Sequence, residues 1–183
     1  WMQESETIFT ETVNYYDRSR ASISLLGCFN VRDKDGNDIT SNFTPRLKHL
    51  LILLILYTEK NAQGILASKT TEILWPDKEE TAARNVNLRK LRVLLESIGD
   101  MEVMIENNFL RIKWGTGVFC DYHTLITCTK QFEQEKSEEL LNRILEILLY
   151  GPLLPNTILD WLDDFKDDYS SYSIDLLKNL LDI

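Results

Sequence analysis

The sequence contains little of what builds disulfide, zinc or membrane frameworks. Its 183 residues include only three cysteines, Cys28, Cys120 and Cys128, which are scattered and lack CxxC spacing. We therefore expect neither a disulfide framework nor a zinc site, but three reduced, buried thiols. The longest apolar run covers residues 50–56, whereas a membrane-crossing helix needs about 20 residues. No spanning segment is predicted.

A secretion signal is also missing. The chain begins at Trp1 rather than Met, and no basic stretch with an apolar core follows. We expect a cytoplasmic protein, or the cytoplasmic part of a larger, membrane-attached regulator, and a piece of a longer chain. Residues 1–21 are too short and too mixed to identify beyond a linker or N-terminal extension.

The motifs of the common catalytic and metal centres are absent. There is no phosphate-cradling glycine loop, no Ser-His-Asp order and no HExxH. His49 and His123 stand far apart without a paired carboxylate motif, so we expect structural or surface roles for both. The aspartates in residues 163–168 lack the Asp-x-Asp-x-Asp-Gly arrangement of calcium loops and indicate a solvated helix face. We predict that the protein is not an enzyme and binds no metal or cofactor.

Charge is distributed unevenly along the chain, whose net charge is -9. Residues 1–21 carry a net charge of -2, residues 22–116 of +1 and residues 117–183 of -8. A near-neutral segment with clustered basic side chains can bind phosphates, whereas the acidic C-terminal third would be repelled by them. Two modules with different partners are implied.

Local signals in residues 22–116 predict a mixed domain of strands and helices. Thr44-Pro45 is a cap followed by a first-turn proline, Ser68 is expected to cap a second helix that Pro76 ends, and Asp77 and Glu80 have capping-box spacing. The predicted elements are strand residues 22–32, a turn at 35–36, a return strand at 38–40, helices over 45–59, 68–75 and 77–97, a short strand at 65–66, and a hairpin over 103–114.

Residues from 121 onward have helical patterns and no strand signal. Helices are predicted over 122–135 and 137–149 and in a third stretch whose aromatic residues are spaced as the buried stripe of a helix; an exposed protein-binding patch is the alternative. These aromatic residues are Trp161, Phe165, Tyr169 and Tyr172. We place the domain boundary at residues 115–118, where charge balance and secondary-structure type both change.

The third predicted helix carries the side chains that indicate function. Helical spacing places Asn85, Arg89 and Arg92 on one face, at positions i, i+4 and i+7. An adjacent face carries the leucines that would anchor the helix, Leu88, Leu91 and Leu95. Such a helix fits a DNA major groove, where arginine can grip guanine edges or phosphates and asparagine can pair with adenine. The alternative is a surface helix whose charged side chains bind no ligand.

The order of the elements strengthens the DNA-binding interpretation. A hairpin, a core helix, a short helix ending at a proline, a basic helix and a terminal hairpin follow one another as in a helix-turn-helix with a wing. Leu25-Leu26-Gly27-Cys28-Phe29-Asn30-Val31, Leu74-Trp75-Pro76-Asp77 and the basic segment Ala83–Arg92 carry a specific resemblance. On these residues, the segment 22–116 resembles the OmpR/PhoB-type winged helix of the bacterial activators called SARP proteins.

A second resemblance covers the C-terminal third. Tyr150-Gly151-Pro152-Leu153-Leu154-Pro155 and Asp160-Trp161-Leu162 resemble the first repeats of the tetratricopeptide-like bacterial transcriptional activation domain that follows the winged helix in such activators. With about 65 residues, this module would be incomplete. The wing departs from the family, since Asn108-Phe109 replace its usual Gly-Tyr and no basic residue stands at the tip.

These observations predict an α+β winged helix-turn-helix over residues 22–116, with an N-terminal antiparallel sheet, three helices and a C-terminal hairpin wing, followed by an all-α module over 117–183. The predicted partner is double-stranded DNA. Further expected partners are RNA polymerase or a sensor domain through the helical module, and a second copy on DNA. The alternative is an interaction adaptor that no longer binds DNA. The predicted DNA-binding residues are Arg84, Asn85, Arg89, Lys90, Arg92, Lys69, Arg111 and Lys113.

Overall fold

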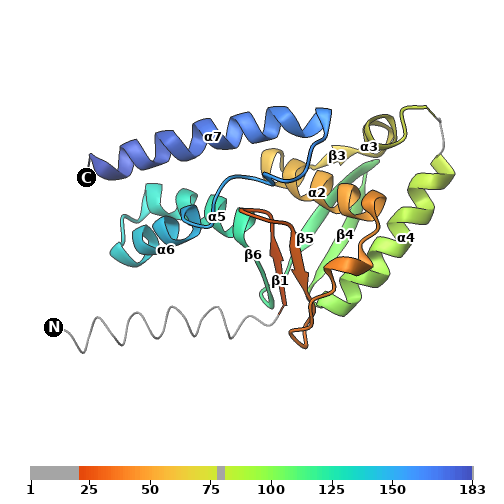
Figure 1. The fold of residues 1–183 in the computed structure, drawn as a ribbon, viewed down its shortest axis with the longest axis horizontal. Coiled ribbons are helices and arrows are strands. Elements are labelled where there is room, and N and C mark those ends of the chain that lie inside the picture. The colour runs from red at the N-terminus through yellow and green to blue at the C-terminus, as the bar shows by residue number, and fades with distance from the viewer. Residues whose placement is uncertain (1–20, 78–80, 183) are drawn as a thin grey trace.

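Two small sheets and a central apolar helix make up the core of the computed structural model, which describes residues 21–77 and 81–182 (Figure 1). The first sheet has the order β2 (Asn30–Arg32), β1 (Ala21–Ser24), β6 (Val118–Cys120), and the second has the order β3 (Ile65–Leu66), β5 (Phe109–Trp114), β4 (Met101–Glu106). The helices are a 3-10 turn η1 (Thr40–Asn42), α2 (Pro45–Lys60), α3 (Ala67–Leu74), α4 (Thr81–Ile98), α5 (Asp121–Gln134), α6 (Glu138–Leu148) and α7 (Asp160–Leu181).

Helix α2 forms the centre of the core. Thr44 stands at the N-cap and Pro45 occupies the first turn, as the sequence predicts, but the Thr44 side chain makes no capping hydrogen bond. Residues 50–56 are all fully buried, because the helix is covered by the second sheet and by α3, α4 and α5. A helix that is apolar all round requires such complete cover.

The second hairpin, predicted over residues 103–114, is formed by β4 and β5. Asn107 and Asn108 connect β4 and β5 with φ values of 50° and 64°, the left-handed region that a tight two-residue hairpin turn needs and asparagine tolerates. Leu110 and Ile112 are buried on one side of β5. The alternation places Arg111 on the opposite side of the strand.

The first hairpin differs from its prediction. Strand β1 pairs with β2 rather than with residues 38–40, which contribute one bridge between Arg32 and Asp38. Thr40 explains the difference, because its side-chain Oγ1 accepts the hydrogen bond of Val31 N at 2.9 Å while the backbone turns into η1. The N-terminal sheet is mixed rather than wholly antiparallel: β1 and β2 are antiparallel as predicted, whereas β6, which the sequence did not indicate, joins β1 in parallel.

Three local predictions need correction or lie outside the description. Cys28 is exposed, whereas the free thiols of Cys120 and Cys128 are buried as expected. Ser68 does not cap α3; Leu66 precedes that helix, because the chain enters it directly from β3. The predicted capping box at the start of α4 involves residues 78–80, which lie outside the described residues.

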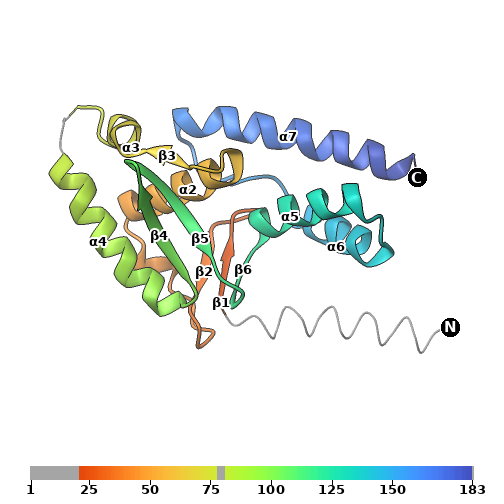
Figure 2. The same ribbon diagram turned by 180° about the vertical axis from the view of Figure 1, so that it is seen from behind.

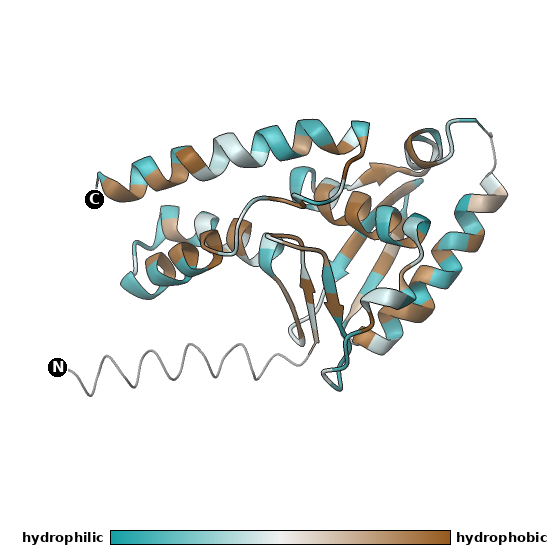
Figure 3. Ribbon diagram, in the orientation of Figure 1, coloured by the Kyte–Doolittle hydropathy of each residue, from teal (hydrophilic) through white to brown (hydrophobic). Residues whose placement is uncertain are grey.

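The C-terminal helices confirm the predicted helical pattern and lie at one end of the molecule, with α4 at the other (Figures 1 and 2). Phe165 and Tyr169 are buried in α7, as the predicted stripe requires, and Trp161 and Tyr172 are partly buried. Figure 3 shows hydrophobic and hydrophilic residues alternating along α4 and α7, as in helices that pack on one side. Within the described residues, no helix combines the length and apolar character needed to cross a bilayer.

Backbone hydrogen bonds join the C-terminal part to the first sheet. Gly27 N donates to Pro152 O at 2.8 Å, and Leu154 N donates to Leu25 O at 2.9 Å. Gly27 has φ of +81°, and a Cβ there would lie 2.3 Å from Tyr150 O. Only glycine permits this close approach.

Asp121 adds a side-chain link at the same junction. This first residue of α5 is 2% exposed, and its carboxylate accepts hydrogen bonds from Leu25 N and Leu26 N, each at 2.9 Å. Burial raises the pKa of Asp121 from 3.8 to about 6, although the backbone hydrogen bonds act in the opposite direction. The domain boundary near residue 116 stays a prediction.

Candidate nucleic-acid interface

Helix α4 lies at an edge of the molecule, with one side on the core and the other open (Figure 2). Its inner side packs on α2, α3 and β4 through buried residues spaced three or four apart: Leu88, Leu91, Leu95 and Ile98. The outer side carries four of the predicted DNA-binding residues, all exposed: Asn85, Arg89, Lys90 and Arg92. The leucines thus hold the polar face outward, as the spacing predicts.

This outer face is electropositive. On the exposed side of α4, the three basic residues Arg89, Lys90 and Arg92 accompany one acidic residue, Glu96. Of the described residues, none forms a salt bridge with Arg89, Lys90 or Arg92. Their charges are therefore available to an anionic ligand.

Arg84 differs from the other predicted contact residues. It is only partly exposed, and its Nη1 donates a hydrogen bond to Thr71 Oγ1 of α3 at 3.0 Å. Its Nε is buried, and no described residue accepts a hydrogen bond from it. The guanidinium thus connects α3 to α4 inside the structure. The sequence places Arg84 on the basic helix but does not reveal Thr71, which comes from another element.

We expect Thr71→Val to lower the free energy of unfolding by about 1–2 kcal/mol, because it keeps the side-chain shape but removes the acceptor of a partly buried guanidinium. Urea denaturation of both proteins measures the difference. Ser68→Ala, an exposed hydroxyl in the same helix, is the control and should be nearly neutral. Equal stability of Thr71→Val and the parent would contradict the bracing role of Arg84.

The remaining basic residues lie off α4 and have partners. Lys69 Nζ on α3 lies 5.2 Å from the ring centroid of Tyr57. Lys113 pairs with Glu102 at 3.6 Å, and Arg111 contacts Glu106 at 4.0 Å. The alternating glutamates of β4 are the sequence signal for these cross-strand pairs. The hairpin is therefore less electropositive than its two basic residues alone indicate.

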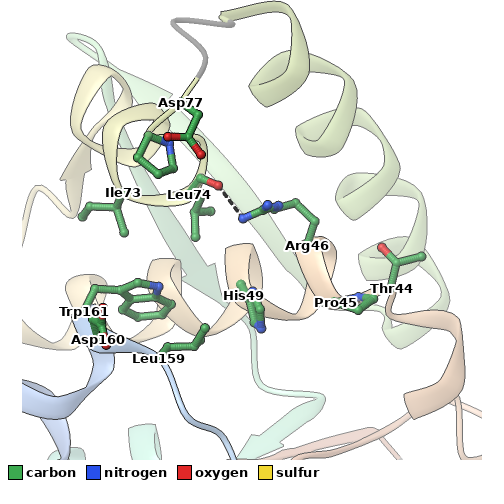
Figure 4. Close-up of a pocket in the computed structure, with 11 residues that line it drawn as sticks. Thr44, Pro45, Arg46, His49, Ile73, Leu74, Asp77, Leu159, Asp160 and Trp161 are labelled. Carbon is green, nitrogen blue, oxygen red and sulfur yellow. Dashed lines mark hydrogen bonds between the residues drawn. The ribbon is translucent and has the colours of Figure 1, made fainter.

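A groove of about 770 Å³ lies between the start of α2, the end of α3 and the start of α7 (Figure 4). Arg46 spans it from α2, donating a hydrogen bond to Leu74 O, while its guanidinium lies 5.7 Å from the Trp75 ring centroid. Burial, and then the charges of Arg46 and Lys48, lower the pKa of His49. Further lining residues include Pro45, Ile73, Asp77, Leu159, Asp160 and Trp161. Sequence patterns did not indicate this groove, because three distant segments form it.

Polar groups elsewhere form interior contacts. His123 Nδ1 lies 2.5 Å from Glu59 Oε1, which also accepts a hydrogen bond from Trp114 Nε1 at 3.0 Å. The His123 ring stacks on Trp114 with centroids 4.7 Å apart. Among the described residues, no three His, Cys, Asp or Glu side chains gather as metal ligands.

Comparison with known proteins gives a structural likeness but no family. No family model matches the chain, and no curated protein matches it. The chain is similar to the solved structure of Mycobacterium tuberculosis EmbR in complex with a low affinity phosphopeptide, with a TM-score of 0.53 and 20% sequence identity. The match covers 88% of this chain and 43% of the EmbR chain, so the chain spans less than half of that protein's length. The two proteins share a mixed α and β fold.

Proposed function

We propose that this chain is a DNA-binding effector of a transcription regulator, and that α4 is the helix that enters the major groove. One observation carries the proposal: Asn85, Arg89 and Arg92 project from one exposed face of a helix whose leucines are buried. A B-DNA major groove admits an α-helix, and these side-chain types match its donors and acceptors. In this proposal, the first part of the chain is a winged helix-turn-helix.

The roles of the basic residues differ. Arg89 and Arg92 contact guanine edges or phosphates, Asn85 contacts adenine, and Lys90 contacts a phosphate. Arg84 acts as a brace between α3 and α4, since its guanidinium is engaged with Thr71. The flanking phosphate contacts come from Lys69, Arg111 and Lys113, which would have to leave their present partners.

The C-terminal helices serve a different partner. Helix α7 contains six acidic and two basic residues, so it would be repelled by phosphates. It lies away from α4 (Figure 1), which allows it to contact a protein while α4 contacts DNA. We assign it to a tetratricopeptide-like module that docks a polymerase subunit or sensor domain. A second copy on a repeated site would strengthen DNA binding.

Selection of duplexes from a random-sequence pool tests the function. We expect enrichment of a common sequence, and a linear fall of log K with log salt as phosphate contacts release counterions. With about four phosphate contacts, raising the salt from 50 to 200 mM should weaken binding roughly 100-fold. A pool that yields no common sequence at low salt would reject DNA readout and favour the interaction adaptor.

A further inference from the structure

Two valines interrupt the polar outer face of α4. Val86 is 42% exposed and Val93 is 65% exposed, although each could have been a polar residue without disturbing the core. At 3.6 residues per turn, Val86 lies about 60° around the helix from Arg89. It also directly follows Asn85. Val86 therefore lies within the face that carries the proposed base contacts.

Neither packing nor helix propensity accounts for an exposed valine at this position. Valine is a weaker helix former than alanine, lysine or glutamine, because its branched side chain loses rotamer freedom in a helix. The side chain is not part of the buried core. A ligand that covers Val86 would supply the burial that the free protein does not give this side chain.

The major groove offers one apolar group at the base edges, the C5-methyl group of thymine. We propose that Val86 is a specificity-determining residue that packs on this methyl group of a thymine beside the base pairs contacted by Asn85 and Arg89. This inference rests on the proposed DNA-binding function. Val86 lies in the second turn of α4, and the N-terminal residues of such helices reach base edges. Val93 lies two turns further on, where the helix leaves the groove.

Replacing each thymine of a selected duplex with deoxyuridine, which lacks only the methyl group, tests the contact. The parent protein should lose about four-fold in affinity at one thymine, the effect of burying one methyl group. Val86→Ala should bind the thymine and deoxyuridine duplexes equally at that position. Val93→Ala, which removes the same atoms from an exposed site of the same helix, should retain the four-fold difference.

The outcomes separate this contact from the DNA-binding function. Insensitivity of the parent to every deoxyuridine, or an unchanged four-fold difference in Val86→Ala, would overturn the valine contact while DNA binding stands. Absence of any selected duplex would overturn both.

Discussion

Replacing Asp121 with alanine is expected to lower the free energy of unfolding by about 3 kcal/mol, because the amide groups of Leu25 and Leu26 lose their acceptor inside the protein. A buried N–H group without a partner costs about 1–3 kcal/mol. Urea denaturation at pH 7 measures the loss. Asp164→Ala, an exposed aspartate of α7, is the matched control and should be nearly neutral.

The same carboxyl group should make stability depend on pH. The pKa of Asp121 is about 6 in the folded protein and 3.8 as an ordinary aspartate, so the folded state binds the extra proton between these pH values. Its contribution therefore falls as pH rises from about 4 to above 6, by roughly 3 kcal/mol in total. Asp121→Asn keeps an acceptor oxygen and cannot ionise.

The difference in unfolding free energy between the parent and Asp121→Asn isolates this contribution. This difference should change by about 2 kcal/mol, to the disadvantage of the parent, as pH rises from 4 to 7, because only the parent must ionise a buried group. A difference that is constant over this range would contradict the assigned pKa and its cause.

The double substitution Arg89→Ala and Arg92→Ala should weaken binding to a selected duplex about 100-fold at fixed salt. Each well-placed arginine contact contributes about 1–3 kcal/mol, and both side chains are exposed, so the fold should be retained. Fluorescence anisotropy with a labelled duplex measures the affinity. Circular dichroism checks that the helical content is unchanged.

A second double variant distinguishes the effect of losing two positive charges from the effect of their position on α4. Lys130 on α5 and Lys136 between α5 and α6 are both exposed, and replacing both with alanine removes the same charge from the C-terminal part of the chain. This control should bind within about two-fold of the parent, because screening limits distant charges. Equal losses in the two double variants would show that α4 has no special role.

The face of α4 could be predicted because it depends on local spacing alone. Leucines at intervals of three and four residues fix which side is buried, and Arg89 and Arg92 then fall outside. The hairpin was predictable for a similar reason, since Asn107 and Asn108 suit a tight turn, although the predicted tip also included Glu106, which is the last residue of β4.

Contacts between distant segments were not predictable from the same patterns. Asp121 accepts a hydrogen bond from Leu25, which lies 96 positions earlier in the chain. Strand β6 has only three residues, too few to show the alternating pattern of a strand. Spacing also could not distinguish Arg84 from Arg89, because Thr71 is the residue that engages Arg84. Which basic residue is exposed and which braces the fold depends on tertiary packing.

Backbone amide shifts of the labelled chain, recorded while a selected duplex is added, test the role of α4 most directly. The largest changes should fall in residues 81–92, with smaller ones in α3 and the β4–β5 hairpin, and α7 should be unaffected. Changes concentrated in α5 to α7, with residues 81–92 unmoved, would contradict the proposed interface.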